Sequence, residues 1–510
     1  MKKIFNLSLM ILAIASISIA QTPKITFHDM EKVKTDPGLV TYVKTDVGYV
    51  LLKREAIRGP GGYRYFLDVR NESMGKVKVY NVSEQLGDEN ISQGSFELLG
   101  DKLVLFSKNL IKKSNKVDYY YQSIDVNTFE VSKPKKFYEL AYEDKKKKAS
   151  LAVTVSQNGK YLLVRIDPPY DDGDEESLTM HLMDSELNTI WKREKYGLEH
   201  EDKDYSILNV QVSNTGKVFV MGKVNEEDEY ELFRFSKENV IDIEFDFEDF
   251  DYRGLNMRLS PKGDVYLSGY ITNEDTRGKT GVFMRKLDGK TLVELADEQT
   301  KYSQDYIFLG TPLKQRLKDE KRAAKKDYEI GVSNLTKDAV LFDESGSMYL
   351  VGSEYYVIVT TTTNANGHTS TTRTYYYQDI HVSKFDGAGD HVYDAKIPRF
   401  QTVKKRPIDS FTWLVHDGVI SFAFLDHKEN LGVQGNMKED GIIHTKKAKK
   451  SILAIATIED ENVITRKVLY DYVAKKEKLK IYKMIEGKDE TIISTYFGSN
   501  EFKVGYLRAE

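Results

Sequence analysis

One phrase recurs along most of this chain: a strand, a polar turn that contains a glycine, and a second strand. Apolar and polar residues alternate on both sides of each turn, a pattern typical of a hairpin with one buried face. The glycines at the turns are expected to supply the positive φ that such turns require. Clear copies cover Leu151–Ile166, Leu208–Val224, Leu255–Ile271 and Ala339–Tyr355, with turn glycines Gly159, Gly216, Gly263 and Gly346, and weaker copies cover Phe96–Asn109 and Phe411–Asp426.

A second strand–turn–strand phrase follows each hairpin, so one unit holds four antiparallel strands. A unit of about 45 to 60 residues with four strands is typical of a propeller blade, since radial repetition leaves only short, protected sheet edges. The sequence therefore predicts an all-β fold, a single β-propeller over residues 21–510. We expect seven blades, with six and eight left open, because Thr41–Val82 and the C-terminal Lys478–Arg508 are expected to share one blade and close the ring. Two separate β-sandwiches are the alternative fold.

The first twenty residues have the features of a secretory signal peptide. Lys2 and Lys3 precede an apolar run from Ile4 to Ile19 that ends in Ser18-Ile19-Ala20, a small-x-small cleavage site. We therefore expect residues 1–20 to be removed and the protein to be exported to the periplasm or cell surface. A membrane anchor is the alternative, but the run is shorter than the roughly 20 residues that a spanning helix needs, and no later segment is expected to span a membrane.

Composition narrows the class of protein further. With 40% hydrophobic and 11% aromatic residues, the chain can bury a large core. A net charge of −4 offers no field that would attract nucleic acid, so no nucleic-acid partner is expected. The chain has no cysteine, which excludes disulfides, thiolate chemistry and a lipid anchor on cysteine.

Two insertions interrupt the rhythm of the blades. Residues 311–331 read as a helix: Thr311 can cap it, Pro312 suits its first position, and Gly331 lies beyond its end. Its apolar stripe is thin and consists of Leu313, Leu317, Ala324 and Tyr328. We expect a solvated helix across the propeller rim, with binding of an acidic partner or lipid headgroups through its Lys and Arg residues as the alternative.

The second insertion, residues 353–380, reads as a long hairpin that turns at Asn364–Gly367. Such a ribbon exceeds an ordinary blade strand of about 5 to 6 residues. A two-stranded ribbon is marginal in water, so it is expected to lie against its own propeller or against a partner. Its tyrosines are rigid aromatic anchors, and they are the predicted binding residues: Tyr355, Tyr356, Tyr375, Tyr376 and Tyr377.

Recognised catalytic motifs are absent from the sequence. It contains no Gly-x-Ser-x-Gly elbow, no His-Glu-x-x-His helix and no Gly-rich phosphate loop. The acidic runs Asp171–Glu176 and Glu244–Asp251 lack the order of a calcium loop and are interpreted as solvated turns. We therefore predict no catalytic residues, no metal site and no cofactor.

Two regions of the sequence resemble known groups of propeller proteins. The phrase Ser-x-x-Gly-Lys-hydrophobic, at Ser156–Leu162 and Ser213–Phe219, resembles the repeats of TolB and WD40-like propellers. The region from Tyr349 through Tyr356, Tyr375–Gln401 and onward to Asp426 is similar to uncharacterised secreted propeller proteins of the Bacteroidota. These resemblances imply fold and lineage but no activity, because propellers host many functions.

The expected function is a binding and scaffolding module of the cell envelope that engages envelope or outer-membrane proteins. The alternative is a carbohydrate-active or peptidase-like hydrolase with carboxylates at the central channel, and a glycan is kept as an alternative ligand. An enzyme should carry carboxylates or a histidine with perturbed pKa on its innermost strands. A scaffold should instead show a plugged or featureless channel and an exposed aromatic patch.

Overall fold

A computed structural model describes most of the chain. The described residues are 23–27, 31–32, 38–46, 48–56, 63–82, 92–111, 113–141, 150–167, 173–225, 229–246, 254–272, 275–404, 410–432, 451–460, 463–471, 479–486, 490–497 and 501–509. The predicted signal peptide, residues 1–20, lies outside them, as do Asp171, Asp172 and most of the second acidic run.

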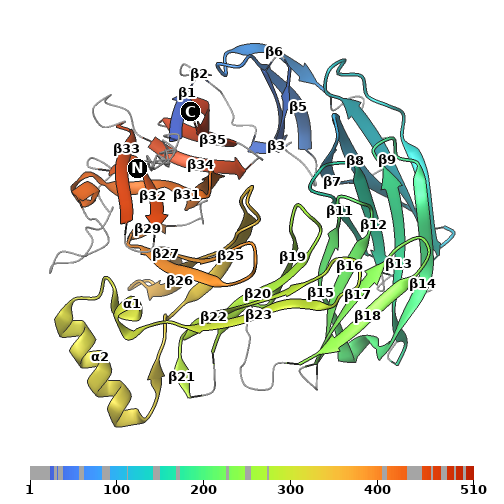
Figure 1. Cartoon of the computed structure of the whole chain (residues 1–510). Helices are drawn as coiled ribbons and strands as arrows, with labels where there is room; N and C mark the ends of the chain where they lie inside the picture. Colours follow the sequence, from blue (N-terminus) through green and yellow to red (C-terminus); the bar gives the residue numbers. More distant parts are fainter. Residues whose placement is uncertain are drawn as a thin grey trace, which may run out of the picture.

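The described residues form eight antiparallel sheets, each with a row of four strands, that follow one another along the chain and are arranged in a ring (Figure 1). Two of these sheets carry a fifth strand. The first four sheets contain β3 (Gly38–Thr45), β4 (Gly48–Ala56), β5 (Tyr63–Arg70) and β6 (Lys76–Asn81); β7 (Ser92–Leu99), β8 (Lys102–Ile111), β9 (Lys116–Asp125) and β10 (Lys135–Ala141); β11 (Ser150–Val155), β12 (Tyr161–Asp167), β13 (Glu175–Asp184) and β14 (Thr189–Glu201); and β15 (Tyr205–Val212), β16 (Val218–Val224), β17 (Glu229–Phe235) and β18 (Val240–Phe245).

The other four sheets contain β19 (Asn256–Leu259), β20 (Val265–Ile271), β22 (Gly281–Leu287) and β23 (Glu294–Lys301); β25 (Leu335–Phe342), β26 (Met348–Thr363), β27 (Thr369–Phe385) and β28 (His391–Ile397); β30 (Phe411–His416), β31 (Val419–His427), β32 (Ser451–Asp460) and β33 (Val463–Tyr470); and β34 (Leu479–Glu486), β35 (Glu490–Phe497), β36 (Glu501–Ala509) and β1 (Pro23–Phe27). We number these sheets as blades one to eight in this order.

The eighth blade closes the ring. Its outermost strand is β1, which pairs antiparallel with β36 from Pro23↔Ala509 to Phe27↔Gly505. The short β2 (Glu31–Lys32) pairs with β36 further along. The two terminal stretches that the sequence assigned to one shared blade belong to separate blades. The count is therefore eight, one of the two alternatives left open beside the expected seven.

A separate hydrophobic cluster fills each interface between neighbouring blades. Blades one and two share the cluster around Leu52 and Leu105, for example, and blades six and seven share the one around Val382 and Phe422. The series continues around the ring to the interface of blades eight and one, where Ile492 packs with Leu51. Eight blades joined by eight apolar interfaces make the fold a single closed β-propeller, as the repeated phrase predicted.

The predicted turn glycines have the expected conformation. Gly159, Gly216, Gly263 and Gly346 have φ values of 66°, 74°, 98° and 93°, in the left-handed region that favours glycine. Because these turns join the first and second strands of blades three to six, the local signal of the repeat is confirmed at each of them.

The helical insertion lies between blades five and six (Figure 1). It contains α1 (Gln304–Phe308), α2 (Leu313–Lys326) and β24 (Glu329–Ile330), and β24 pairs in parallel with β21 (Thr276–Arg277). Pro312, not Thr311, occupies the N-cap position of α2. No helix among the described residues is long and apolar enough to cross a membrane.

The predicted apolar stripe of this helix was wrong. Leu313 and Leu317 are 69% and 56% exposed, whereas Ala323 is buried. Arg316 attaches an adjacent side of α2 to the fold: its guanidinium bonds Asp305 at 3.1 Å and lies 5.0 Å from the centre of the Phe308 ring. An ion pair and a cation–π contact thus decide which side of the helix faces the blades.

Candidate functional site

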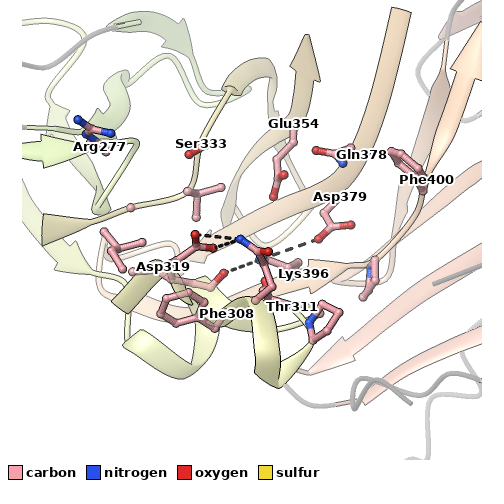
Figure 2. Close-up of a pocket in the computed structure, with 18 of the residues that line it drawn as sticks. Arg277, Phe308, Thr311, Asp319, Ser333, Glu354, Gln378, Asp379, Lys396 and Phe400 are labelled. Carbon is pink, nitrogen blue, oxygen red and sulfur yellow. Dashed lines mark hydrogen bonds and ion pairs between the residues drawn. The ribbon is translucent and has the colours of Figure 1, made fainter. Parts of the chain in front are cut away.

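A cavity of about 640 Å³ lies where the two insertions meet, beside the sixth blade. One wall is formed by α1, α2 and the residues around β24, and the other by the base of the long hairpin and the segment after β28 (Figure 2). This volume falls within the range of about 300 to 1,000 Å³ that ligand sites occupy.

The floor of the cavity is built on an irregularity in the hairpin. Ser353 pairs with Ile380 and Tyr355 pairs with Tyr377, so Glu354 on β26 stands opposite two residues of β27, Gln378 and Asp379. Such a bulge breaks the alternation of side chains and redirects them. Glu354, Gln378 and Asp379 all line the cavity as a result (Figure 2).

A chain of hydrogen bonds holds Glu354 in place. The buried His381 contacts Glu354 Oε1 through Nε2 at 3.0 Å and the Tyr306 hydroxyl through Nδ1 at 2.9 Å. Burial and the nearby Lys396 lower the pKa of His381 to about 3, so the imidazole is neutral. We assign its proton to Nε2, which donates to the carboxylate, and Nδ1 then accepts from Tyr306 on α1.

Two buried cations support the other wall. The ammonium of Lys396 donates to the carbonyls of Ile307 and Leu309 at 3.1 and 3.2 Å, and it lies 3.9 Å from Asp379 Oδ2. Arg399 donates through Nε to the carbonyl of Gln378 and through Nη1 to that of Ser410. These bonds attach α1 to β28 and fix the segment that follows β28.

The carboxylates on the floor are largely withdrawn from solvent. Glu354 and Asp379 are 17% and 20% exposed, and both line the cavity. Burial and the neighbouring Glu354 raise the pKa of Asp379 to about 6, despite the opposing effect of Lys396. Burial also raises the pKa of Glu354. The cavity thus holds two carboxylates that ionise less readily than usual.

The predicted tyrosines lie at the base of the hairpin. Tyr355 faces Tyr377 with ring centroids 5.2 Å apart, and Tyr356 stacks on Tyr376 at 4.6 Å. A further strand, β29 (Gln401–Lys404), pairs with β27 over Thr374–Tyr377, so this part of the hairpin is three-stranded. Tyr375 and Tyr377 are buried, and the other three tyrosines are partly buried. The structure brings all five together as a packed base.

The outer half of the hairpin extends into solvent. Every residue from Val357 to Thr363 on β26 and from Thr369 to Arg373 on β27 is exposed, including the apolar Val357, Ile358 and Val359. Packing against its own propeller, one of the two expected arrangements, therefore covers the base of the hairpin and leaves its outer half bare within the described part of the protein.

Perturbed carboxylates also occur on two innermost strands. Burial raises the pKa of Glu97 on β7 to about 7 and that of Asp338 on β25 to about 6. They belong to blades two and six, on opposite sides of an eight-bladed ring, so the structure does not bring them together.

The sequence did not identify Glu354, Asp379, His381 or Lys396 as site residues. Lys396 and His381 lie in blade strands whose alternation is unremarkable, and Tyr306 precedes the recognised insertion. The one available signal in the sequence was that Glu354 and Asp379 stand at the junction between the repeated blade pattern and the inserted hairpin. Among the described residues, no group of three or more His, Asp and Glu side chains could hold a metal ion.

No family model matches the chain, and no curated protein matches it. Among solved structures, the β-propeller domain of the Trilobed protease from Pyrococcus furiosus is 11% identical, with a TM-score of 0.37 over 87% of this chain and 98% of that one. The polysaccharide lyase Uly1 is 9% identical, with a TM-score of 0.36 over 95% and 100% of the two chains. An acylaminoacyl peptidase from Pyrococcus horikoshii is 9% identical, with a TM-score of 0.35 over 93% of this chain and 57% of that one.

Proposed function

We propose that this protein is an exported binding module of the cell envelope that captures a protein partner by strand addition to the outer half of its long hairpin. The proposal is carried by one observation, the exposed stretch of β26 from Val357 to Thr363. β25 pairs with β26 only as far as Glu354, so the outer edge of β26 is unpaired beyond that point among the described residues.

The direction of the backbone groups on this edge follows from two hydrogen bonds. The Tyr355 N–H donates to Asn334, on the outer side of β26, whereas the Asn364 N–H donates to His368, on the side of β27. Because backbone groups alternate along a strand, Val357, Val359, Thr361 and Thr363 point their N–H and C=O groups outward. An incoming strand would find a regular ladder of donors and acceptors.

The edge also lacks the usual protection against strand addition. Natural edge strands carry lysine, proline or a bulge that prevents pairing. The stretch Val357–Thr363 contains no charge and no proline, and its pairing with β27 is regular. We infer that an extended, uncharged segment of an envelope protein is the partner, and that the tyrosine base holds the ribbon in position.

A proline at the edge tests the proposal. Val359→Pro removes one outward N–H without removing a bond to β27, so folding should persist while partner capture from the native envelope falls at least tenfold. Val359→Thr, which keeps the N–H, should capture the partner as the wild type does. Equal capture by the two variants and the wild type would locate the binding surface elsewhere.

Shortening the hairpin gives a second test. Replacing Ile358–Arg373 by an Asn-Gly turn should leave the three-stranded base and the fold intact while removing the same partner. A cut as deep as Tyr355 to Tyr377 would instead remove the strand that pairs with β29. A folded, shortened protein that retains the partner would refute strand addition.

The alternative of a hydrolase at the central channel has less support, because Glu97 and Asp338 lie on opposite blades. Hydrolysis by two carboxylates requires them within about 10 Å of each other.

A further inference from the structure

We propose that the cavity between α2 and the base of the hairpin binds a protonated alkylamine, the chemical group at the end of a lysine side chain. This site is separate from the edge of β26, and the inference does not depend on strand addition.

The charge balance at the floor of the cavity leads to this ligand. Glu354 and Asp379 bring two carboxylates to one bulge, and Lys396 is the one cation in ion-pair range of either among the described residues. Lys396 is 3% exposed and already donates to Ile307 and Leu309. Arg277, Arg322 and Arg399 also line the cavity, but within the described structure none of them lies in ion-pair range of Glu354 or Asp379. An ammonium placed between these two carboxylates would pair with both at short range.

Unused hydrogen-bond acceptors lead to the same ligand. Asp379 Oδ1 accepts from the backbone N–H of Arg399 at 3.0 Å, but Asp379 Oδ2 has only Lys396, at an ion-pair distance of 3.9 Å. Glu354 uses Oε1 for His381. Within the described structure Asp379 Oδ2 and Glu354 Oε2 thus remain available, and an ammonium has three donors, enough for both.

The cavity also offers apolar surface for an aliphatic stem. Phe308, Ile330 and Phe400 line it together with the polar groups at its floor. Amphipathic side chains of this kind bury their methylene stems on apolar surface while the charged end is solvated or paired. The site therefore combines an apolar passage with an anionic floor.

The network beneath the floor holds the two carboxylates in fixed positions. His381 is 1% exposed and neutral, so it donates to Glu354 without adding a charge. The bulge and the bonds of Arg399 fix the backbone on the Asp379 side. A preorganised pair of acceptors loses little entropy when an ammonium binds.

Titration of the wild-type protein with two capped amino acids tests the proposal directly. Nα-acetyl-lysine methylamide should bind, whereas the neutral isostere Nα-acetyl-norleucine methylamide should bind at least tenfold more weakly, as measured by calorimetry and by NMR shift changes at pH 7.5. Equal affinity for the two, or no binding of the lysine probe at 20 mM, would overturn the proposal.

Isosteric variants locate the site. Asp379→Asn and Glu354→Gln should each weaken the lysine probe at least tenfold. Asp297→Asn is the control, because Asp297 on β23 pairs with Arg285 in the fifth blade and does not line the cavity. It should change the affinity less than twofold. Unchanged affinity in both floor variants would refute the assignment, as would an equal loss in the control.

The pH dependence of the wild type provides a test that needs no variant. Amine affinity should be highest above pH 6 and fall below it as Asp379 takes up a proton, since the pKa of Asp379 is about 6. A flat profile between pH 5 and 8 would contradict the proposal. The other titratable or charged groups that face the site are Glu354, Tyr306, His381, Asp394, Lys396, Arg399, Asp319, Arg322 and Arg277.

The source of the amine is decided by a third probe. Tighter binding of free cadaverine than of the capped lysine would assign the site to a diffusible diamine, and the reverse order would assign it to a lysine of a partner protein. Either order supports an amine site, whereas failure of both probes refutes it. If both amine probes fail, Val359→Pro is still expected to lose partner capture, so the two proposals can be tested separately.

Discussion

A buried ion pair beside the cavity permits a quantitative test of the fold. Arg466 Nη1 lies 3.0 Å from Asp426 Oδ2, and the two side chains are 0% and 1% exposed. Arg466 also donates to the carbonyl of Pro398, so the pair fixes the segment that carries Arg399 and Phe400 into the cavity wall.

We expect Arg466→Met to lower the free energy of unfolding by about 3 to 5 kcal/mol. At an effective dielectric constant of about 20, charges 3.0 Å apart attract each other by about 5 kcal/mol. The buried carboxylate would lose this partner and keep only the donors Asn430 and His427 on Oδ1. A buried charge left without its partner typically lowers the free energy of unfolding by about 3 to 5 kcal/mol.

The double variant separates the ion pair from simple packing. Asp426→Asn with Arg466→Met removes both charges, and it also removes the Arg466 Nε donor, which has no partner among the described residues. The double variant should therefore be at least about 2 kcal/mol more stable than the sum of the single effects predicts. Urea unfolding monitored by fluorescence and circular dichroism measures all four proteins. Additive effects, or a cost below about 1 kcal/mol for Arg466→Met, would show that the pair is unimportant.

Three further predictions address other parts of the molecule. Gly505→Ala should lower the unfolding free energy by about 1 to 3 kcal/mol, because its Cβ would lie 2.3 Å from the Thr26 carbonyl where β1 closes the ring; unchanged thermal unfolding would contradict this closure. Burial raises the pKa of Glu97 to about 7 from 4.5, so the folded state holds the proton more tightly and ionisation opposes folding. The stability of Glu97→Gln relative to wild type should therefore rise between pH 4.5 and 7 and then level off. A difference in stability that does not change with pH would refute the buried carboxyl. Leu317→Ser should change stability by less than about 0.5 kcal/mol, since Leu317 is 56% exposed; a larger loss would mean that the predicted stripe is buried after all.

The sequence predicted the features that depend on local pattern. Alternation and turn glycines such as Gly159 and Gly263 identified the hairpins, because a strand's buried face and a left-handed turn each leave a signal within a few residues. Ring closure was harder to predict: β1 is five residues long and pairs with the other end of the chain, so no period marks it.

The candidate site depends on three-dimensional placement and was missed for that reason. Glu354 and Asp379 meet through one bulge, and a one-residue shift of register reverses which face a side chain occupies. The stripe on α2 failed because hydropathy alone cannot show that Arg316 would bind Asp305 and Phe308. The five tyrosines were correctly placed on the hairpin, but their packing against one another and beside β29 is a tertiary property.

The pairing of β1 with β36 has a consequence for how the molecule folds. β1 and β36 lie near opposite ends of the described chain, so β1 has no partner strand, and the outer edge of β36 stays bare, until these two distant segments meet. Contacts this distant in sequence form slowly, because the closure entropy of the intervening chain opposes them. Blades one to seven, whose strands are contiguous in sequence, can mature first. Ring closure is then the late, slow step, and it is the stage at which a half-finished edge is open to aggregation or to a chaperone.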